Sequence, residues 1–191
     1  LPGDQREEDG GALVFDSEPL TEDVEILGAP VVELELSADR PVAMVAVRLT
    51  DVRGDHKAAR VTYGLLNLTH REGHEHPEPL EPGRRERVRV AMNDVAHVFP
   101  AGHRLRVAVS TSYWPLAWPS PELAELAVVT GASRLLLPVR APRDEDGDLR
   151  PYEQPAVAPG TPVTRLRPVD HGWEVRRDLA TDRSTLEVRK D

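Results

Sequence analysis

The segment LTHREGHEHPEPLEPG, residues 68–83, gathers imidazole and carboxylate side chains within a short stretch. His74, His76 and Glu81 follow one another with the spacing H-x-H-x4-E. Neutral imidazole nitrogens and a carboxylate oxygen are ligands that suit a divalent transition metal. These three residues are therefore the candidate metal ligands of the chain.

The same spacing is similar to the first metal motif of cupins, which are jelly-roll β-barrels. In that motif the ligands project from a paired strand, whereas Pro77, Pro79 and Pro82 here remove ladder hydrogen bonds. The glycines of the motif are missing, and Leu105 stands where a second His would follow the turn PAG. The sequence favours a solvated loop, and a cupin-like metal-binding domain is kept as an alternative.

Serine-hydrolase chemistry on an α/β-hydrolase fold needs G-x-S-x-G, because the sharp turn at the nucleophile requires small neighbours. No such pentapeptide occurs in the chain. The nearest serine with small neighbours, Ser133 in Gly131-Ala132-Ser133-Arg134, lacks the second glycine. His and Asp residues are present, but composition does not define a triad. We therefore expect no catalytic triad here.

A third candidate site is RDEDGD, residues 143–148, in which Asp144, Asp146 and Asp148 alternate as in a calcium loop. Such a loop needs Gly at its sixth position and Glu at its twelfth. Leu149 and Pro155 occupy those positions. A charged linker explains the segment, and we expect no cofactor.

Two of the three tryptophans stand in the loop Tyr113-Trp114-Pro115-Leu116-Ala117-Trp118. Trp114 and Trp118 could form a platform on which sugars stack. They could instead line a pocket wall or an interdomain contact, where Trp is favoured for its large buried area and single N–H donor. In the third interpretation Tyr113, Trp114 and Trp118 cap the core of their own domain.

The overall composition of the chain argues against several classes of binding partner and of site. The net charge of −9, from 24 basic and 33 acidic residues, argues against nucleic acid or an anionic membrane as partner. No apolar run approaches the ~20 residues of a membrane span. The start LPGDQREEDGG is no signal peptide and lacks Met, so we expect a piece of a longer chain or a processed one. Zero Cys excludes a disulfide framework and a Cys nucleophile, and a cytoplasmic location is expected.

Period-two alternation dominates the sequence and predicts half-buried strands. Denser apolar runs at 60–68 and 133–139 predict strands that are covered on both faces. The one expected helix is short, at 121–129, with Pro121 in its first turn. The alternating runs lie at 31–38, 44–52, 87–92 and 104–111, with shorter strands expected at 12–17 and 24–27.

Many short strands joined by Pro- and Gly-containing turns predict an all-β fold, a sandwich or barrel with at most a short helix. We assign residues 1–140 to this domain and the Pro- and charge-rich residues 141–162 to a linker. Residues 163–191 are expected to form a hairpin-like extension around the turn at 180–182.

Several segments, in order, carry a resemblance: SEPLTEDVEILGAPVVELELSAD, AVRLTDV, and PLEPGRRERVRVAMNDVAHVFPAGHRLRVAVSTSYWP. They resemble the C-terminal domain of the cocaine-esterase/X-prolyl dipeptidyl aminopeptidase (CocE/NonD) family of serine hydrolases. The most specific piece is FPAGHRLRVAVSTSYWP, and the resemblance runs from about Asp4 to Pro138. Many family members continue with Asn and Asp after this piece, whereas this chain has LAWPSP.

The resemblance implies a jelly-roll β-sandwich of the galactose-binding-like type that holds none of the catalytic triad. In that family the Ser, Asp and His belong to an α/β-hydrolase domain that carries a helical cap. The C-terminal domain packs against both and completes the rim of the active site. Because flanking prolines hold their loop rigid at a strand end, Tyr113, Trp114 and Trp118 are the candidate interface or substrate-rim residues.

We therefore expect a non-catalytic C-terminal domain of a serine hydrolase that cleaves ester or amide bonds, with X-Pro dipeptidyl bonds among the candidates. Its expected partners are the α/β-hydrolase and cap domains of the same parent chain. Neither nucleic acid nor a membrane is expected as a partner, and a homo-oligomer is left open. The alternatives are a carbohydrate-binding β-sandwich module and the cupin-like domain.

Overall fold

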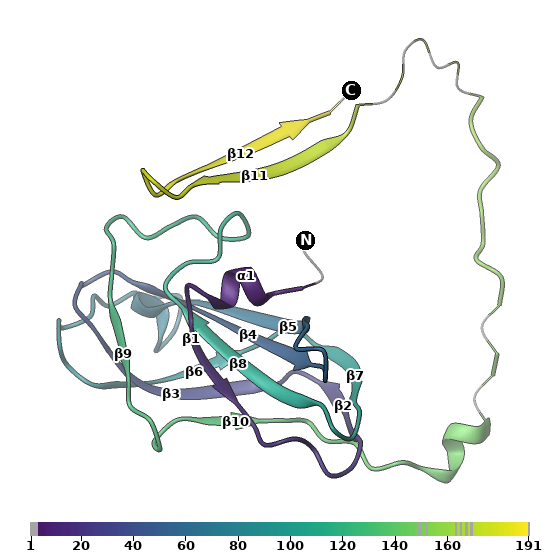
Figure 1. Ribbon diagram of the computed structural model, residues 1–191, viewed down its shortest axis with the longest axis horizontal. Coiled ribbons are helices and arrows are strands. Elements are labelled where there is room, and N and C mark those ends of the chain that lie inside the picture. The colour runs from purple at the N-terminus through teal and green to yellow at the C-terminus, as the bar shows by residue number, and fades with distance from the viewer. Residues whose placement is uncertain are drawn as a thin grey trace. The chain divides into compact units, whose positions relative to one another are not determined.

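The computed structural model (Figure 1) describes residues 4–148, 150–151, 153–162, 164, 166, 168 and 170–190. The chain divides into two compact units, Leu1–Ala141 and Pro142–Asp191. The first unit is built from two facing sheets and one further strand pair, and the second contains a single hairpin. The prediction of an all-β sandwich is confirmed.

The first sheet has four antiparallel strands in the order β1, β8, β4 and β5. Period-two alternation places Val45, Val47 and Leu49 of β4 on the face that packs into the core. The intervening Arg48 points to the opposite face together with Tyr63, its cross-strand neighbour on β5. The strands are β1 (Leu13–Asp16), β8 (Arg104–Ser110), β4 (Met44–Val52) and β5 (Ala58–Asn67).

The second sheet is centred on β3 (Val31–Ala38), which pairs with β6 (Glu86–Ala91) along one edge. Two short strands share its other edge, β10 (Arg134–Leu136) and β9 (Leu126–Val128). A separate pair joins β2 (Val24–Gly28) to β7 (Val95–Phe99). Figure 1 shows the two sheets as separate layers.

The hydrophobic core lies between these layers. Gly64 of β5 permits the close approach of β6, because an added Cβ would lie 2.5 Å from the carbonyl oxygen of Ala91. Each buried aliphatic or aromatic side chain contributes about 1.5–3 kcal/mol relative to exposure. The larger core members are Ile26, Val32, Leu34, Leu36, Val45, Val47, Leu49, Leu68, Leu80, Val88, Val90, Met92, Phe99, Leu105 and Val109.

The prediction of a helix at 121–129 is wrong. None of these residues, all of which the structure describes, is helical, and β9 occupies 126–128. Alternation in LAV lets Leu126 and Val128 pack on the core while β9 pairs with the otherwise open edge of β3. Strand β10 is also not covered on both faces, since Leu136 is exposed.

Three short helical segments complete the described chain: α1 (Arg6–Asp9), η1 (Leu68–His70) and η2 (Asp144–Asp148). In the second unit, β11 (Gly172–Asp178) pairs with β12 (Arg183–Arg189) around the turn at 179–182. In residues 163–169, the first part of the expected hairpin-like extension, positions 163, 165, 167 and 169 lie outside the described residues, and 164, 166 and 168 belong to no strand.

Candidate interaction surface

The outer face of the first sheet is polar although much of it is buried. Arg48 and Thr50 of β4 are almost inaccessible, and Arg60 and Tyr63 of β5 and Arg106 of β8 are partly covered. Their alternate neighbours face the core, so these side chains must point outward. Two segments cover this face. One is residues 4–9, which we call the N-terminal segment, and the other is the loop of residues 112–118, which we call the aromatic loop.

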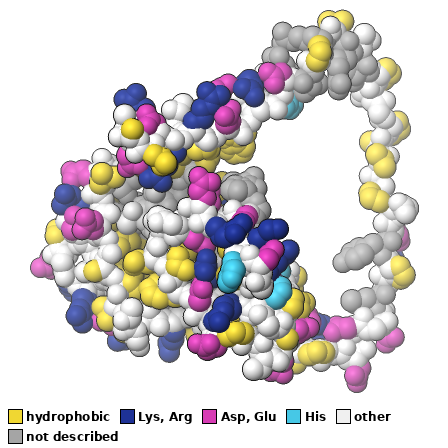
Figure 2. Space-filling view, in the orientation of Figure 1, with side chains coloured by type: hydrophobic (Ala, Val, Ile, Leu, Met, Phe, Trp, Pro, Cys, Tyr) yellow, Lys and Arg dark blue, Asp and Glu magenta, His cyan; other side chains and the backbone are white. Residues whose placement is uncertain are grey.

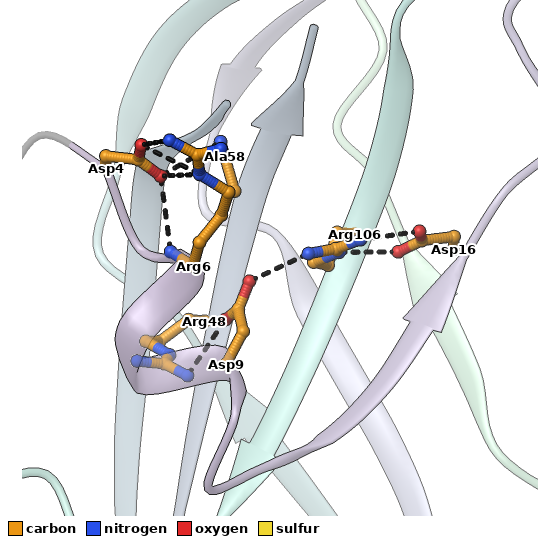
Figure 3. Close-up of polar contacts among 7 residues, drawn as sticks. All are labelled: Asp4, Arg6, Asp9, Asp16, Arg48, Ala58 and Arg106. Carbon is orange, nitrogen blue, oxygen red and sulfur yellow. Dashed lines mark hydrogen bonds and ion pairs between the residues drawn. The ribbon is translucent and has the colours of Figure 1, made fainter. Parts of the chain in front are cut away.

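Asp9, at the end of α1, bridges two arginines of neighbouring strands (Figure 3). Arg48 Nη2 donates to Asp9 Oδ1 at 3.0 Å, and Arg106 Nη1 donates to Asp9 Oδ2 at 3.0 Å. The side chains of Arg48 and Asp9 are only 3% and 5% exposed. A buried carboxylate shared by two guanidinium groups fixes α1 on the sheet.

Arg106, the second arginine bound to Asp9, also binds β1. Arg106 Nε and Nη2 donate to the two oxygens of Asp16 at 2.7 and 2.8 Å in a bidentate pair. These hydrogen bonds hold the pKa of Asp16 below its ordinary value, and Asp16 in turn raises the pKa of Arg106. The pair ties the edge strand β1 to β8 through side chains as well as through the backbone.

The N-terminal segment is attached to the start of β5 as well (Figure 3). The backbone N–H of Gln5 donates to the carbonyl of Ala58 at 2.8 Å. Asp4 accepts hydrogen bonds from the guanidinium and backbone N–H of Arg6, which lower the pKa of Asp4 to about 2. These contacts order the chain ahead of α1 against the sheet.

Tyr113 joins the aromatic loop to this polar layer. It is 8% exposed, and its ring meets the edge of Tyr63 at a centroid distance of 5.4 Å. Its hydroxyl accepts a hydrogen bond from Arg60 and donates one to Gln5 Oε1 at 3.4 Å. Tyr113 therefore anchors the aromatic loop to the outer face of the first sheet, on the side away from the hydrophobic core.

Trp118 differs from Tyr113, because its side chain is 82% exposed. It meets Trp114 edge to face, with ring centroids 5.5 Å apart and an interplanar angle of 72°. Trp114 is half-buried, and its Nε1 has no hydrogen-bond partner among the described residues. The backbone N–H of Ala117 donates to the carbonyl of Tyr113 at 3.0 Å and closes the loop. The crossed rings do not offer the two coplanar faces that a sugar platform would use.

The candidate metal ligands are not brought together. His74 Nδ1 lies 3.1 Å from His70 Nδ1, a contact that the sequence did not suggest, and Glu81 pairs with Arg84 at 3.4 Å. Within the described part of the chain no three His, Cys, Asp or Glu side chains form a group that could hold a metal ion. This includes Asp144, Asp146 and Asp148, which are exposed or half-buried in η2.

A cluster that the sequence did not predict surrounds Asp51 at the end of β4. His103 Nδ1 donates to Asp51 Oδ1 at 2.7 Å and His97 Nε2 to Oδ2 at 3.3 Å, while the carboxylate is 5% exposed. Histidine and carboxylate are two parts of a triad, but in the described structure neither imidazole hydrogen-bonds a serine hydroxyl. Ser133 instead donates to the Val129 carbonyl. The cluster ties β7 and the turn before β8 to β4.

Residues 2–148 match the family described as the X-Pro dipeptidyl-peptidase C-terminal non-catalytic domain. The chain belongs to this family. The expected resemblance to the CocE/NonD hydrolases is thereby confirmed, and the region matched includes the polar layer and the aromatic loop.

Individual relatives are consistent with this family assignment. Cocaine esterase of Rhodococcus sp. (strain MB1 Bresler) is 31% identical over 116 residues, which are 60% of this chain and 20% of that protein. A solved α-amino acid ester hydrolase superposes with a TM-score of 0.65 at 29% identity and covers 73% of this chain. A CocE/NonD family hydrolase from Staphylococcus aureus shares the fold, with a TM-score of 0.58, 16% identity and 72% coverage.

The chain spans only a part of each relative: 20% of cocaine esterase, 28% of the α-amino acid ester hydrolase and 32% of the staphylococcal hydrolase. Most of each relative therefore has no counterpart in this chain. In the part of the chain that the structure describes, no helix is long and apolar enough to cross a membrane.

Proposed function

We propose that this chain is an accessory domain of a serine hydrolase that cleaves ester or amide bonds. It packs on an α/β-hydrolase domain and its cap and helps to complete the rim of the active site. The Ser nucleophile of the acyl-transfer reaction lies elsewhere in the parent chain. Family membership supports this role, since the family is described as non-catalytic.

The observation that carries the proposal is the exposure of Trp118 on a fixed support. An exposed Trp beside a buried Tyr and Arg has the composition of a binding hot spot. The support is already ordered by Asp9 and Tyr113, so docking would cost little further side-chain entropy. We therefore assign Tyr113, Trp114 and Trp118 to the surface that faces the hydrolase domain.

A fluorophosphonate probe tests the location of the nucleophile. We expect the probe to label the parent protein and to leave the 191-residue chain unlabelled. Labelling of a serine in this chain would refute the accessory role.

Substitution in the parent protein tests the surface. Trp118→Ala should lower kcat/KM or loosen the domain contact, whereas Leu123→Ala, a still more exposed apolar control outside the loop, should not. Equal effects of the two variants would contradict the assignment. A cytoplasmic location belongs to the same proposal as the default, since a chain without Cys has no disulfide that would indicate an oxidising compartment.

A further inference from the structure

Arg60 differs from the other arginines of the polar layer. Arg48 and Arg106 both reach Asp9, and Arg106 also holds Asp16. Among the described residues no carboxylate forms an ion pair with Arg60, although it is half-buried. Of these three arginines, Arg48 and Arg106 are therefore paired with carboxylates of the described chain, and Arg60 is not.

The surroundings of Arg60 hold its guanidinium in place without neutralising it. Its Cζ lies 5.1 Å from the ring centroid of Tyr63 and 5.9 Å from that of Tyr113, and it donates to the Tyr113 hydroxyl. A guanidinium carries five N–H donors in a planar fork, so most of its hydrogen-bonding capacity is unused. A partly desolvated cation of this kind is stabilised by an anion with matching planar geometry.

A chain of contacts links Arg60 to the exposed Trp118. Arg60 contacts Tyr113, Trp114 follows Tyr113 in the chain, and the Trp114 ring meets Trp118. Arg, Tyr and Trp are the residues enriched at the energetic centres of protein interfaces.

A polyanion is a poor candidate for the occupant. The chain carries a net charge of −9, and basic and acidic side chains are interspersed on the face of the first unit seen in Figure 2. Nucleic acid and anionic membranes are bound through clustered Lys and Arg, whereas a single guanidinium fork fits one carboxylate.

We propose that Arg60 receives an Asp or Glu carboxylate from the catalytic part of the parent chain, in a bidentate pair, while Trp118 packs into an apolar recess beside that carboxylate. The inference rests on the proposed function and adds the chemistry of the partner surface. An interdomain ion pair shielded by aromatic rings would fix the orientation of the two domains in addition to their affinity.

Hydrogen exchange of the Ala117 amide, which is bonded to the Tyr113 carbonyl, reports on docking. In the parent protein this amide should exchange more slowly than in the isolated 191-residue chain. Arg60→Met, which keeps the aliphatic stem, should reduce that extra protection about tenfold. Arg89→Met, on the outer face of the other sheet, is the matched control and should leave it unchanged.

Two further measurements identify the anion. The effect of Arg60→Met should shrink at about 1 M NaCl, where the Debye length is about 3 Å. Arg60→Lys retains the charge but lacks the fork, so it should restore only part of the protection. Arg60→Lys keeps a cation beside Tyr63, so it can replace Arg60→Met in the test if the Met variant destabilises the isolated chain.

The outcomes separate the two proposals. Loss of protection in Trp118→Ala but not in Arg60→Met would overturn the carboxylate partner and leave the accessory role standing. Full rescue by Arg60→Lys would overturn the bidentate geometry. Equal Ala117 exchange in the parent and in the isolated chain would overturn the docking surface itself.

Discussion

Asp9→Asn provides a direct test of the polar layer that supports the aromatic loop. The substitution keeps the shape of the side chain but removes the charge that Arg48 and Arg106 share. Arg106 keeps Asp16, whereas Arg48 is left as a buried guanidinium without a carboxylate. Removing one partner of a buried ion pair costs about 3–5 kcal/mol, because the remaining charge stays desolvated.

For a domain of this size such a loss lowers Tm by about 10–15 °C. Differential scanning calorimetry of the 191-residue chain would measure the shift in the transition of the sandwich unit. The double variant Asp9→Leu/Arg48→Met should recover most of the stability, because two apolar side chains leave no buried charge unpaired.

The matched control is Asp16→Asn at neutral pH. Its pair with Arg106 is more open to water, with side chains 33% and 19% exposed, so its loss should cost about 0–1 kcal/mol. The reasoning fails if Asp9→Asn costs no more than this control. It also fails if the double variant is as unstable as the sum of its single substitutions.

Three further expectations concern the sandwich unit alone. Trp118→Ala should change the free energy of unfolding by no more than about 0.5 kcal/mol in urea, because the side chain is exposed; a larger loss would make Trp118 a core cap. Gly64→Ala should cost about 1–3 kcal/mol in the same assay, since its Cβ would meet the Ala91 carbonyl oxygen, and a neutral result would contradict the close approach of the strands. Asp4 and Asp16 have folded pKa values lowered by their arginine partners, that of Asp4 to about 2. Their contributions to the free energy of unfolding are complete above the unfolded pKa of about 3.9 and are lost as the pH falls through the folded pKa. In Asp16→Asn the free energy of unfolding should therefore fall less steeply with decreasing pH than in the unmodified chain. An unchanged slope would count against the pair of Asp16 and Arg106.

The strand pattern could be predicted where apolar side chains that face the core alternate with polar ones along the sequence. Strands β3 and β4 begin and end at the residues that the alternation indicated. Strand β7 was missed although VAHVF alternates, since its inner position is the polar His97, which is stabilised by Asp51 from a distant strand. The segment at 121–129 favours a short helix by its sequence, because Pro121 suits the first turn of a helix. The unpaired edge of β3 decides otherwise, and no local pattern contains that information.

Of the candidate interaction surface, only the residue types of the aromatic loop could be predicted from the sequence. The sequence placed Tyr113, Trp114 and Trp118 in one loop, but it could not divide them into a buried anchor and an exposed tip. That division depends on Arg60 and Gln5, which reach the loop from other parts of the chain. Helix α1 was missed for a similar reason, since four residues show no periodicity and are held by ion pairs with distant strands.

The buried polar layer explains why the aromatic loop can present an exposed tryptophan without a hydrophobic base. Burying Arg48 and Asp9 under α1 is a weak source of stability, since an apolar layer of the same volume would serve as well or better. What the charges add is directionality, because Asp9 accepts one hydrogen bond from Arg48 and one from Arg106, which fixes the position of the N-terminal segment on the sheet. Gln5 of the same segment accepts the hydrogen bond of the Tyr113 hydroxyl. A loop fixed in this way can dock repeatedly in the same orientation. The polar layer is therefore expected to contribute more to the orientation of the aromatic loop than to the stability of the sandwich.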